Sequence, residues 1–185
     1  MEPPLSPPLR ALLELGALDR LPRTGWIQRG VPDPESVAGH VLGTAYVALH
    51  LASRVCPPLD RGRVLTLALV HDAPEALSGD LPRAASELLP AGAKRELELG
   101  AARRLLGPLD GQAVEDVADY ADGRTREARF VRLCDKLQLG VRLLGYVRSG
   151  RRGLEDFRDG LEALDCSEFE PAEQLRRELL AALGE

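Results

Sequence analysis

The stretch VLTLALVHDAPEALSGDLP, residues 64–82, decides the fold class. Its first seven residues are apolar apart from Thr66, so they predict a helix that is central and buried on nearly all sides. The apolar run ends on two polar residues, His71 and Asp72. Because buried polar groups need partners or a metal ion, this ending predicts a functional site at the carboxyl end of the helix.

Helical signals continue on both sides of this stretch. Ser36 is expected to begin a helix, Ser6 to lie near a helix cap, Asp60 to cap a helix, and the prolines after Cys56 to stop one. Sustained alternation of apolar and polar residues, which would indicate strands, is absent. We therefore expect an all-α fold in one domain, with the motifs in about 22–140 and the helices of 154–183 packed on them. The expected helices cover residues 8–15, 36–55, 61–72, 91–106, 112–121, 125–148, 154–163 and 171–183, with a turn-rich segment at 21–34 and a turn at 74–77.

Composition excludes several classes of protein. The 185-residue chain has a formal charge of -5, which argues against binding polynucleotides through bulk charge. Its three cysteines are widely spaced and form no CxxC motif, so we expect neither a disulfide framework nor a cysteine-rich zinc site, and a reducing cytoplasm fits best. The sequence has no apolar run of the roughly 20 residues that a membrane span needs, and no secretory signal, so no membrane partner is expected.

Histidine is scarce, with three residues in the chain. His40 lies beside the apolar stripe of its helix, and Asp135 is an acid inside the apolar segment FVRLCDKL. Imidazole nitrogens and carboxylate oxygens together suit Mn²⁺, Co²⁺, Fe²⁺ or Zn²⁺. The structural alternatives are that the histidines are buried and bonded to the backbone, and that Asp135 forms a salt bridge to Arg132 or Arg142. His50 is expected to be structural or exposed. The predicted metal ligands are His40, His71, Asp72 and Asp135.

These residues, in this order, resemble the H…HD…D pattern of the HD-domain metal-dependent phosphohydrolases. The spacings are 31 residues from His40 to His71 and 63 from Asp72 to Asp135. HDAPE followed by GDLP is similar to the HD-x-x-E…GD signature of the 5′-deoxynucleotidase family, and PRTGWIQRGV at 22–31 is closest to its eukaryotic and archaeal branch. The dipeptide HD alone is weak, whereas the ordered set, which spans roughly residues 9–160, is specific.

The resemblance implies a compact single-domain HD-domain helical bundle over residues 1–185. It also implies a divalent metal (Mn, Co, Mg, Fe or Zn), a homodimer, and hydrolysis of deoxyribonucleoside 5′-monophosphates to deoxynucleoside and phosphate. Two alternatives stay open. One is an HD hydrolase of another nucleotide: a dNTP, an alarmone or a cyclic nucleotide. The other is a non-catalytic, nucleotide-sensing helical module.

Three carboxylates are candidates for the catalytic work. Asp72 is expected to bind the metal and to orient the attacking water. Glu75 follows it by three residues and is expected to act as general base, or to hold a second cation together with Asp80. The structural alternatives are a first-turn carboxylate for Glu75 and a turn or cap residue for Asp80.

The candidates for substrate binding lie around the chain's one tryptophan. Trp26 is expected to pack on the sugar or base, or else to anchor its loop in the core. Arg23 and Arg29 flank it and are expected to bind the phosphate, unless they are surface arginines. The bacterial branch often has Arg before this Trp, whereas this chain has Gly25, so the phosphate-binding arginine must come from another position.

Overall fold

The computed structural model describes residues 4–184, and these residues confirm the all-α expectation. Between Leu5 and Gly184 the only strand-like pairing is an isolated antiparallel bridge between Pro22 and Ser36. No helix in the described part combines the length and apolar character that crossing a membrane requires. In chain order the elements are α1 (Pro7–Leu15), the 3-10 helix η1 (Gly16–Asp19), α2 (Thr24–Gln28), α3 (Val37–Ala52), α4 (Arg61–Val70), α5 (Glu75–Ser78), α6 (Arg83–Ser86), α7 (Ala93–Leu105), α8 (Gly111–Asp122), α9 (Arg126–Arg148), α10 (Glu155–Glu162) and α11 (Glu170–Gly184).

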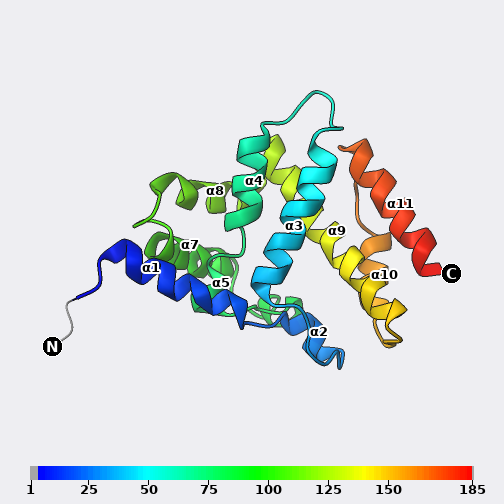
Figure 1. The fold of residues 1–185 in the computed structure, drawn as a ribbon, viewed down its shortest axis with the longest axis horizontal. Coiled ribbons are helices and arrows are strands. Elements are labelled where there is room, and N and C mark those ends of the chain that lie inside the picture. The colour runs from blue at the N-terminus through cyan, green and yellow to red at the C-terminus, as the bar shows by residue number, and fades with distance from the viewer. Residues whose placement is uncertain (1–3, 185) are drawn as a thin grey trace.

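Three helices, α3, α4 and α9, form the centre of the molecule and pack against one another (Figure 1). α1, α5, α7 and α8 lie on one side of them, and α10 and α11 lie against α9 on the other. The central helices therefore bring three distant parts of the sequence together.

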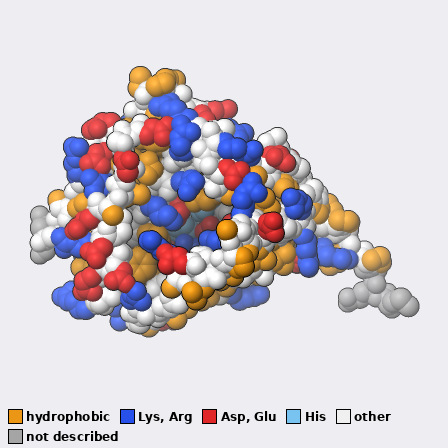
Figure 2. All heavy atoms as spheres, turned by 180° about the vertical axis from the view of Figure 1, so that it is seen from behind, with side chains coloured by type: hydrophobic (Ala, Val, Ile, Leu, Met, Phe, Trp, Pro, Cys, Tyr) orange, Lys and Arg blue, Asp and Glu red, His pale blue; other side chains and the backbone are white. Residues whose placement is uncertain are grey.

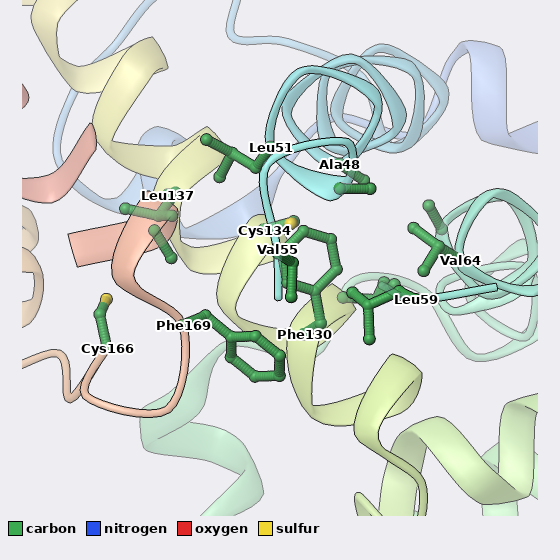
Figure 3. Packing of buried hydrophobic residues seen from close by; sticks show 14 of the residues in the cluster. Ala48, Leu51, Val55, Leu59, Val64, Phe130, Cys134, Leu137, Cys166 and Phe169 are labelled. Atoms are coloured by element: carbon green, nitrogen blue, oxygen red, sulfur yellow. The ribbon is translucent and has the colours of Figure 1, made fainter. Parts of the chain in front are cut away.

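The main apolar core fills the space between the central helices and the C-terminal segment (Figure 3). Phe130 of α9 and Phe169, just before α11, are fully buried, and their rings meet edge to face at 5.2 Å. Burying one such side chain stabilises a fold by about 1.5–3 kcal/mol. Cys134 lies in the same cluster with no exposed surface, as expected for a small buried hydrophobe.

Side-chain caps fix where the central helices begin. The hydroxyl of Ser36 accepts a hydrogen bond from the Gly39 amide, and the carboxylate of Asp60 accepts one from the Arg63 amide. The predicted cap at Asp60 is thus confirmed, and Ser36, expected to begin its helix, is the cap before it. Each satisfies an amide that the first helical turn leaves free. α3 ends at Ala52, before the prolines that were expected to stop it.

The prediction that the 61–72 helix is buried on nearly all sides is wrong. α4 is a shorter helix that contacts α3, α8 and α9, and its outer face carries Leu65 and Leu69, which are 36% and 66% exposed. The short elements η1, α2 and α6 were not expected either. Four or five residues carry too little periodic signal to predict a helix, so tertiary contacts decide whether one forms.

Candidate metal centre

The four predicted ligands come from three segments that the central helices hold together. His40 lies in α3, His71 and Asp72 lie in the turn that follows α4, and Asp135 lies in α9. One side-chain atom from each of His40, His71 and Asp72 lies within 4.8 Å of the other two. Oδ2 of Asp72 is 3.6 Å from Nε2 of His40 and 3.4 Å from Nε2 of His71. Oδ1 of Asp135 is 3.0 Å from Nε2 of His40.

Three ligand atoms that face this centre make no well-aligned hydrogen bond among residues 4–184, although two of them, Nε2 of His40 and Oδ1 of Asp135, lie 3.0 Å apart. The three atoms are Nε2 of His40, Nε2 of His71 and Oδ1 of Asp135, and all three are buried. A buried polar atom without a partner is costly in a folded protein and needs an explanation. Two imidazole nitrogens and two carboxylate oxygens suit a divalent metal ion. The residues present therefore fit such an ion.

The outward-facing atoms of the same side chains are all bonded. Nδ1 of His71 donates to the carbonyl oxygen of Ala68 at 2.8 Å, so its Nε2 points to the centre. Oδ2 of Asp135 accepts from the Tyr120 hydroxyl at 2.8 Å and from Nζ of Lys136 at 2.9 Å. His71 and Asp135 are thus held from behind, which orients the atoms that they present.

Burial and charge determine the protonation of these groups. Burial lowers the pKa of His71, which favours the neutral form that binds metals. Burial alone would raise the pKa of Asp135, but the charges of Lys136 and His40 outweigh it and hold that pKa well below its usual value. Burial alone would lower the pKa of His40, but Asp135 outweighs it and the pKa is raised. A proton and a metal ion therefore compete for Nε2 of His40.

One guanidinium joins three carboxylates beside this centre. NH1 of Arg23 lies 3.2 Å from Asp72, 3.3 Å from Glu75 and 2.7 Å from Asp80. Asp80 also accepts from the backbone amide of Thr24, and the Thr24 hydroxyl donates to the Asp80 carbonyl oxygen at 2.8 Å. The start of α2 is in this way fastened to the GDLP segment.

Glu75 has the most displaced pKa of the three carboxylates. Burial, reinforced by the negative charge of Asp72, raises the pKa of Glu75 to about 9. Its side chain is still 11% exposed, so water can reach it. A carboxyl whose pKa is displaced this far beside a metal site is a candidate acid-base group.

The centre opens on a hollow in the molecular surface. Figure 2 shows this hollow with histidine at its floor and basic and acidic side chains around it. The side chains of Asp72 and Arg23 are 16% and 15% exposed, and that of Lys136 is 55% exposed. A small anionic molecule could therefore reach the carboxylates and the two cations from solvent.

Two of the three predicted substrate contacts lie elsewhere. Trp26 is only 1% exposed and stacks on Phe157, with ring centroids 3.7 Å apart. This indole has no free face on which a sugar could pack in this structure, which favours the anchoring alternative, and the sugar contact stays a prediction. Arg29 pairs with Asp156 on the surface, away from the three carboxylates. Arg23 alone of the predicted arginines lies in the site.

Four residues that support the site were not predicted from the sequence. Lys136 and Tyr120 contact Asp135, Gln138 bonds to Nδ1 of His40, and Glu35 bonds to Gln138. Lys136 adjoins Asp135 and could have been found as one of only two lysines in the chain. Gln138 is a polar residue in an apolar helix segment, three residues after Asp135. Nothing in the local pattern singles out Glu35 or Tyr120, because only helix packing gives them their partners.

Comparison of the sequence with known proteins identifies relatives. A family model described as HD domain matches residues 15–159. The Xenopus laevis protein named 5'-deoxynucleotidase HDDC2 is 34% identical over 147 residues, covering 77% of this chain and 72% of that protein. The Homo sapiens protein of the same name is 31% identical over 157 residues, covering 82% and 74%.

Solved structures also resemble this fold. A protein described as PH0347 from Pyrococcus horikoshii superposes with a TM-score of 0.81 at 29% identity, covering 94% of this chain and 99% of that one. A conserved hypothetical protein from Pyrococcus furiosus gives a TM-score of 0.79 at 30% identity, covering 92% and 98%.

Proposed function

Since the chain belongs to the HD domain family, we propose that it is a metal-dependent 5′-deoxynucleotidase, which releases phosphate from deoxyribonucleoside 5′-monophosphates. The observation that carries this proposal is the set of buried, unpartnered donor atoms of His40, His71 and Asp135 beside Asp72. The curated relatives that share the motifs are named for this activity.

We assign His40, His71, Asp72 and Asp135 as the metal ligands. Their mixed nitrogen and oxygen donors suit Mn²⁺, Co²⁺, Fe²⁺ or Zn²⁺, with Mg²⁺ as a further candidate. When bound, such an ion polarises a phosphoryl oxygen and makes coordinated water more acidic.

The proton transfers are assigned to Glu75. Its buried carboxyl lies beside Asp72, which favours the protonated form, and the neighbouring positive charge of Arg23 opposes this. A metal ion bound nearby would favour the ionised form of Glu75. In that form Glu75 would accept the proton of the attacking water and return it to the departing 5′-oxygen. Asp72 would orient the same water, because its Oδ2 lies 3.6 Å from Nε2 of His40 and 3.4 Å from Nε2 of His71.

Arg23 and Lys136 are proposed to bind the phosphate. Both are positively charged at neutral pH, and each contacts a proposed metal ligand: Arg23 lies 3.2 Å from Asp72, and Lys136 lies 2.9 Å from Asp135. A phosphate offers them oxygens in place of carboxylate oxygens, and an arginine can bind two of these at once. Asp80 holds Arg23 at 2.7 Å, so its part is to position this arginine. A second cation between Glu75 and Asp80 would require Arg23 to move away.

The chain is also proposed to act as a cytoplasmic homodimer. Leu42, Tyr46 and Leu49 follow one face of α3 and are 56%, 63% and 40% exposed. Leu65 and Leu69 are further exposed apolar residues on α4, which packs against α3. Apolar area of this kind on neighbouring helices is typical of a protein–protein contact.

The test is phosphate release from dNMPs, NMPs and dNTPs, each with Mn²⁺, Co²⁺, Mg²⁺ and Zn²⁺. We expect metal-dependent release from dNMPs and its loss in Asp72→Ala, with Asp159→Ala, an exposed carboxylate on α10, as the unaffected control. Preference for ribonucleotides or triphosphates would contradict the substrate. A purified chain that binds no metal and releases no phosphate would instead support the non-catalytic module.

A further inference from the structure

A chain of buried polar contacts runs from the metal centre to the segment before α3. Nδ1 of His40 lies 2.6 Å from Oε1 of Gln138, and Nε2 of Gln138 donates to Oε2 of Glu35 at 2.8 Å. His40, Gln138 and Glu35 are 0%, 3% and 8% exposed. Since water is excluded from these contacts, the direction of each hydrogen bond depends on the groups themselves.

At the far end of this series of contacts, the carboxylate of Glu35 determines the direction of the hydrogen bond with Gln138. Besides Gln138, it accepts from Nε1 of Trp26 at 3.1 Å and from Nε of Arg142 at 2.9 Å. All three partners are N–H donors, so both oxygens of Glu35 act as acceptors. The end of Gln138 that faces Glu35 must therefore be its NH₂ group, although the two ends of an amide look alike in shape.

The orientation of Gln138 in turn decides which nitrogen of His40 carries a proton. With its NH₂ group on Glu35, Gln138 presents its carbonyl oxygen to Nδ1 of His40. A carbonyl oxygen only accepts, so Nδ1 must donate. The lone pair of a neutral His40 then resides on Nε2, the buried atom that faces the metal centre.

We propose that Gln138 and Glu35 are positioning residues that keep the proton of His40 on Nδ1 and thereby commit its Nε2 to the metal ion. This inference rests on the metal site of the proposed function. It also gives Trp26 an indirect role at the metal centre, because its indole donates a hydrogen bond that holds Glu35 in place.

Gly43 supports this assignment independently. It lies one helical turn after His40 in α3, and a Cβ added to it would come within 2.8 Å of Nε2 of Gln138 and 2.9 Å of its Cγ. Both approaches are too close for real Cβ atoms. The glycine therefore leaves the space in which the Gln138 amide lies between α3 and α9.

Nitrogen NMR of ¹⁵N-histidine-labelled full-length protein tests the proposal directly. Zn²⁺ is a suitable probe because it is diamagnetic, and three histidines give a spectrum that His50→Gln and His71→Gln variants can assign. We expect the Zn²⁺-loaded protein to show His40 protonated at Nδ1 and bound to the metal through Nε2. A His40 that carries its proton on Nε2, or that binds through Nδ1, would overturn the proposal.

Two variants test the positioning residues themselves. In Glu35→Gln the new amide can turn its NH₂ group toward Gln138, so Gln138 can turn its own toward His40 and favour a proton on Nε2. Gly43→Ala displaces the Gln138 amide without removing a polar group. We expect each to weaken Zn²⁺ binding by about 10–100-fold, the usual cost of losing a partner behind a metal ligand. Glu35→Gln should also show the altered His40 signal.

Glu173→Gln is the matched control, because this carboxylate pairs with Arg176 and Arg177 on α11, away from the metal centre. Circular dichroism would establish that each variant is folded. Unchanged Zn²⁺ affinity in folded Gly43→Ala and Glu35→Gln would contradict the proposal. The readouts are independent of substrate: a protein with the expected His40 signal that hydrolyses no nucleotide would refute the proposed function and leave this inference standing.

Discussion

Asp72, Glu75 and Asp80 share the guanidinium of Arg23, yet they differ in what else they contact. Asp72 faces the two histidines, and Asp80 is fastened to Thr24. Within residues 4–184, Glu75 has Arg23 as its one side-chain hydrogen-bond partner, at 3.3 Å. A carboxyl that is neither a proposed ligand nor tied to the backbone is free to exchange a proton, which separates the role of Glu75 from those of its neighbours.

Glu75→Gln should therefore lower kcat by about 10²–10⁴-fold, the usual contribution of a general acid or base. Metal affinity should stay unchanged, because Glu75 is not a proposed ligand. Steady-state kinetics together with metal titration would check this. A variant that keeps its kcat would remove Glu75 from the mechanism, and one that loses its metal would make Glu75 a ligand.

Trp26→Phe separates an anchoring role from a substrate contact. Phe preserves an aromatic ring against Phe157 but removes the Nε1 donor to Glu35. Since this leaves a buried carboxylate short of one hydrogen bond, we expect the free energy of unfolding to fall by about 1–3 kcal/mol. The ratio of kcat/KM for deoxyribo- and ribonucleotides should not change. A large change in that ratio, with stability intact, would restore the sugar contact.

At the scale of helices, the junction between α8 and α9 depends on one buried carboxylate. Asp119 of α8 accepts from the amide and the hydroxyl of Thr125, which caps α9, and from NH2 of Arg63 in α4 at 2.6 Å. Burial alone would raise the pKa of Asp119, but the bonds from Thr125 and Arg63 outweigh it, and the pKa is lowered. Asp119 thus fixes the start of the helix that carries Asp135.

Asp119→Asn should destabilise the fold by about 1–3 kcal/mol at pH 7, because the amide cannot accept all of these bonds. A lowered folded-state pKa means that Asp119 contributes fully above its unfolded pKa of about 3.9 and loses this contribution as the pH falls through the folded-state value. The difference in free energy of unfolding between Asp119→Asn and the wild type should therefore become smaller in strong acid. Urea unfolding at pH 7 and pH 3 would measure it.

Asp122→Asn is the control for this prediction. Asp122 pairs with Arg95, but on the exposed surface, where an ion pair contributes about 0–1 kcal/mol. Equal losses of stability in Asp119→Asn and Asp122→Asn would contradict the role of Asp119 at the start of α9.

At the scale of the molecule, α4 leaves apolar residues on the surface. A helix of the sequence of α4 was expected to lie inside the fold, yet Leu69 is 66% exposed. Tyr46, which is 63% exposed, lies on the neighbouring helix α3. In the proposed homodimer, a second copy of the chain covers one face that carries both residues.

Leu69→Lys should consequently convert the dimer into a monomer, since a charge in an apolar contact is costly to desolvate. Light scattering after size-exclusion chromatography would measure the mass. Leu88→Lys is the matched control, because Leu88 is 87% exposed but lies just after α6, outside this face. A wild-type chain that is monomeric at micromolar concentration would refute the dimer.

The sequence by itself determined the main helices, the helix start at Ser36, the cap at Asp60, and the family. These depend on residues a turn or two apart, or on an ordered motif, so they can be read along the chain. His40, His71, Asp72 and Asp135 could be chosen for the same reason: each is a polar residue in an apolar helical setting.

Only the tertiary structure decided which side chains support that set. Gln138 lies 98 residues from His40 and 103 from Glu35, and no local pattern links them. Trp26 is buried instead of facing the site because Phe157, far along the chain, packs on its ring. A buried polar group takes its partner from whichever helix packs against it, and that choice follows from the packing of the whole molecule.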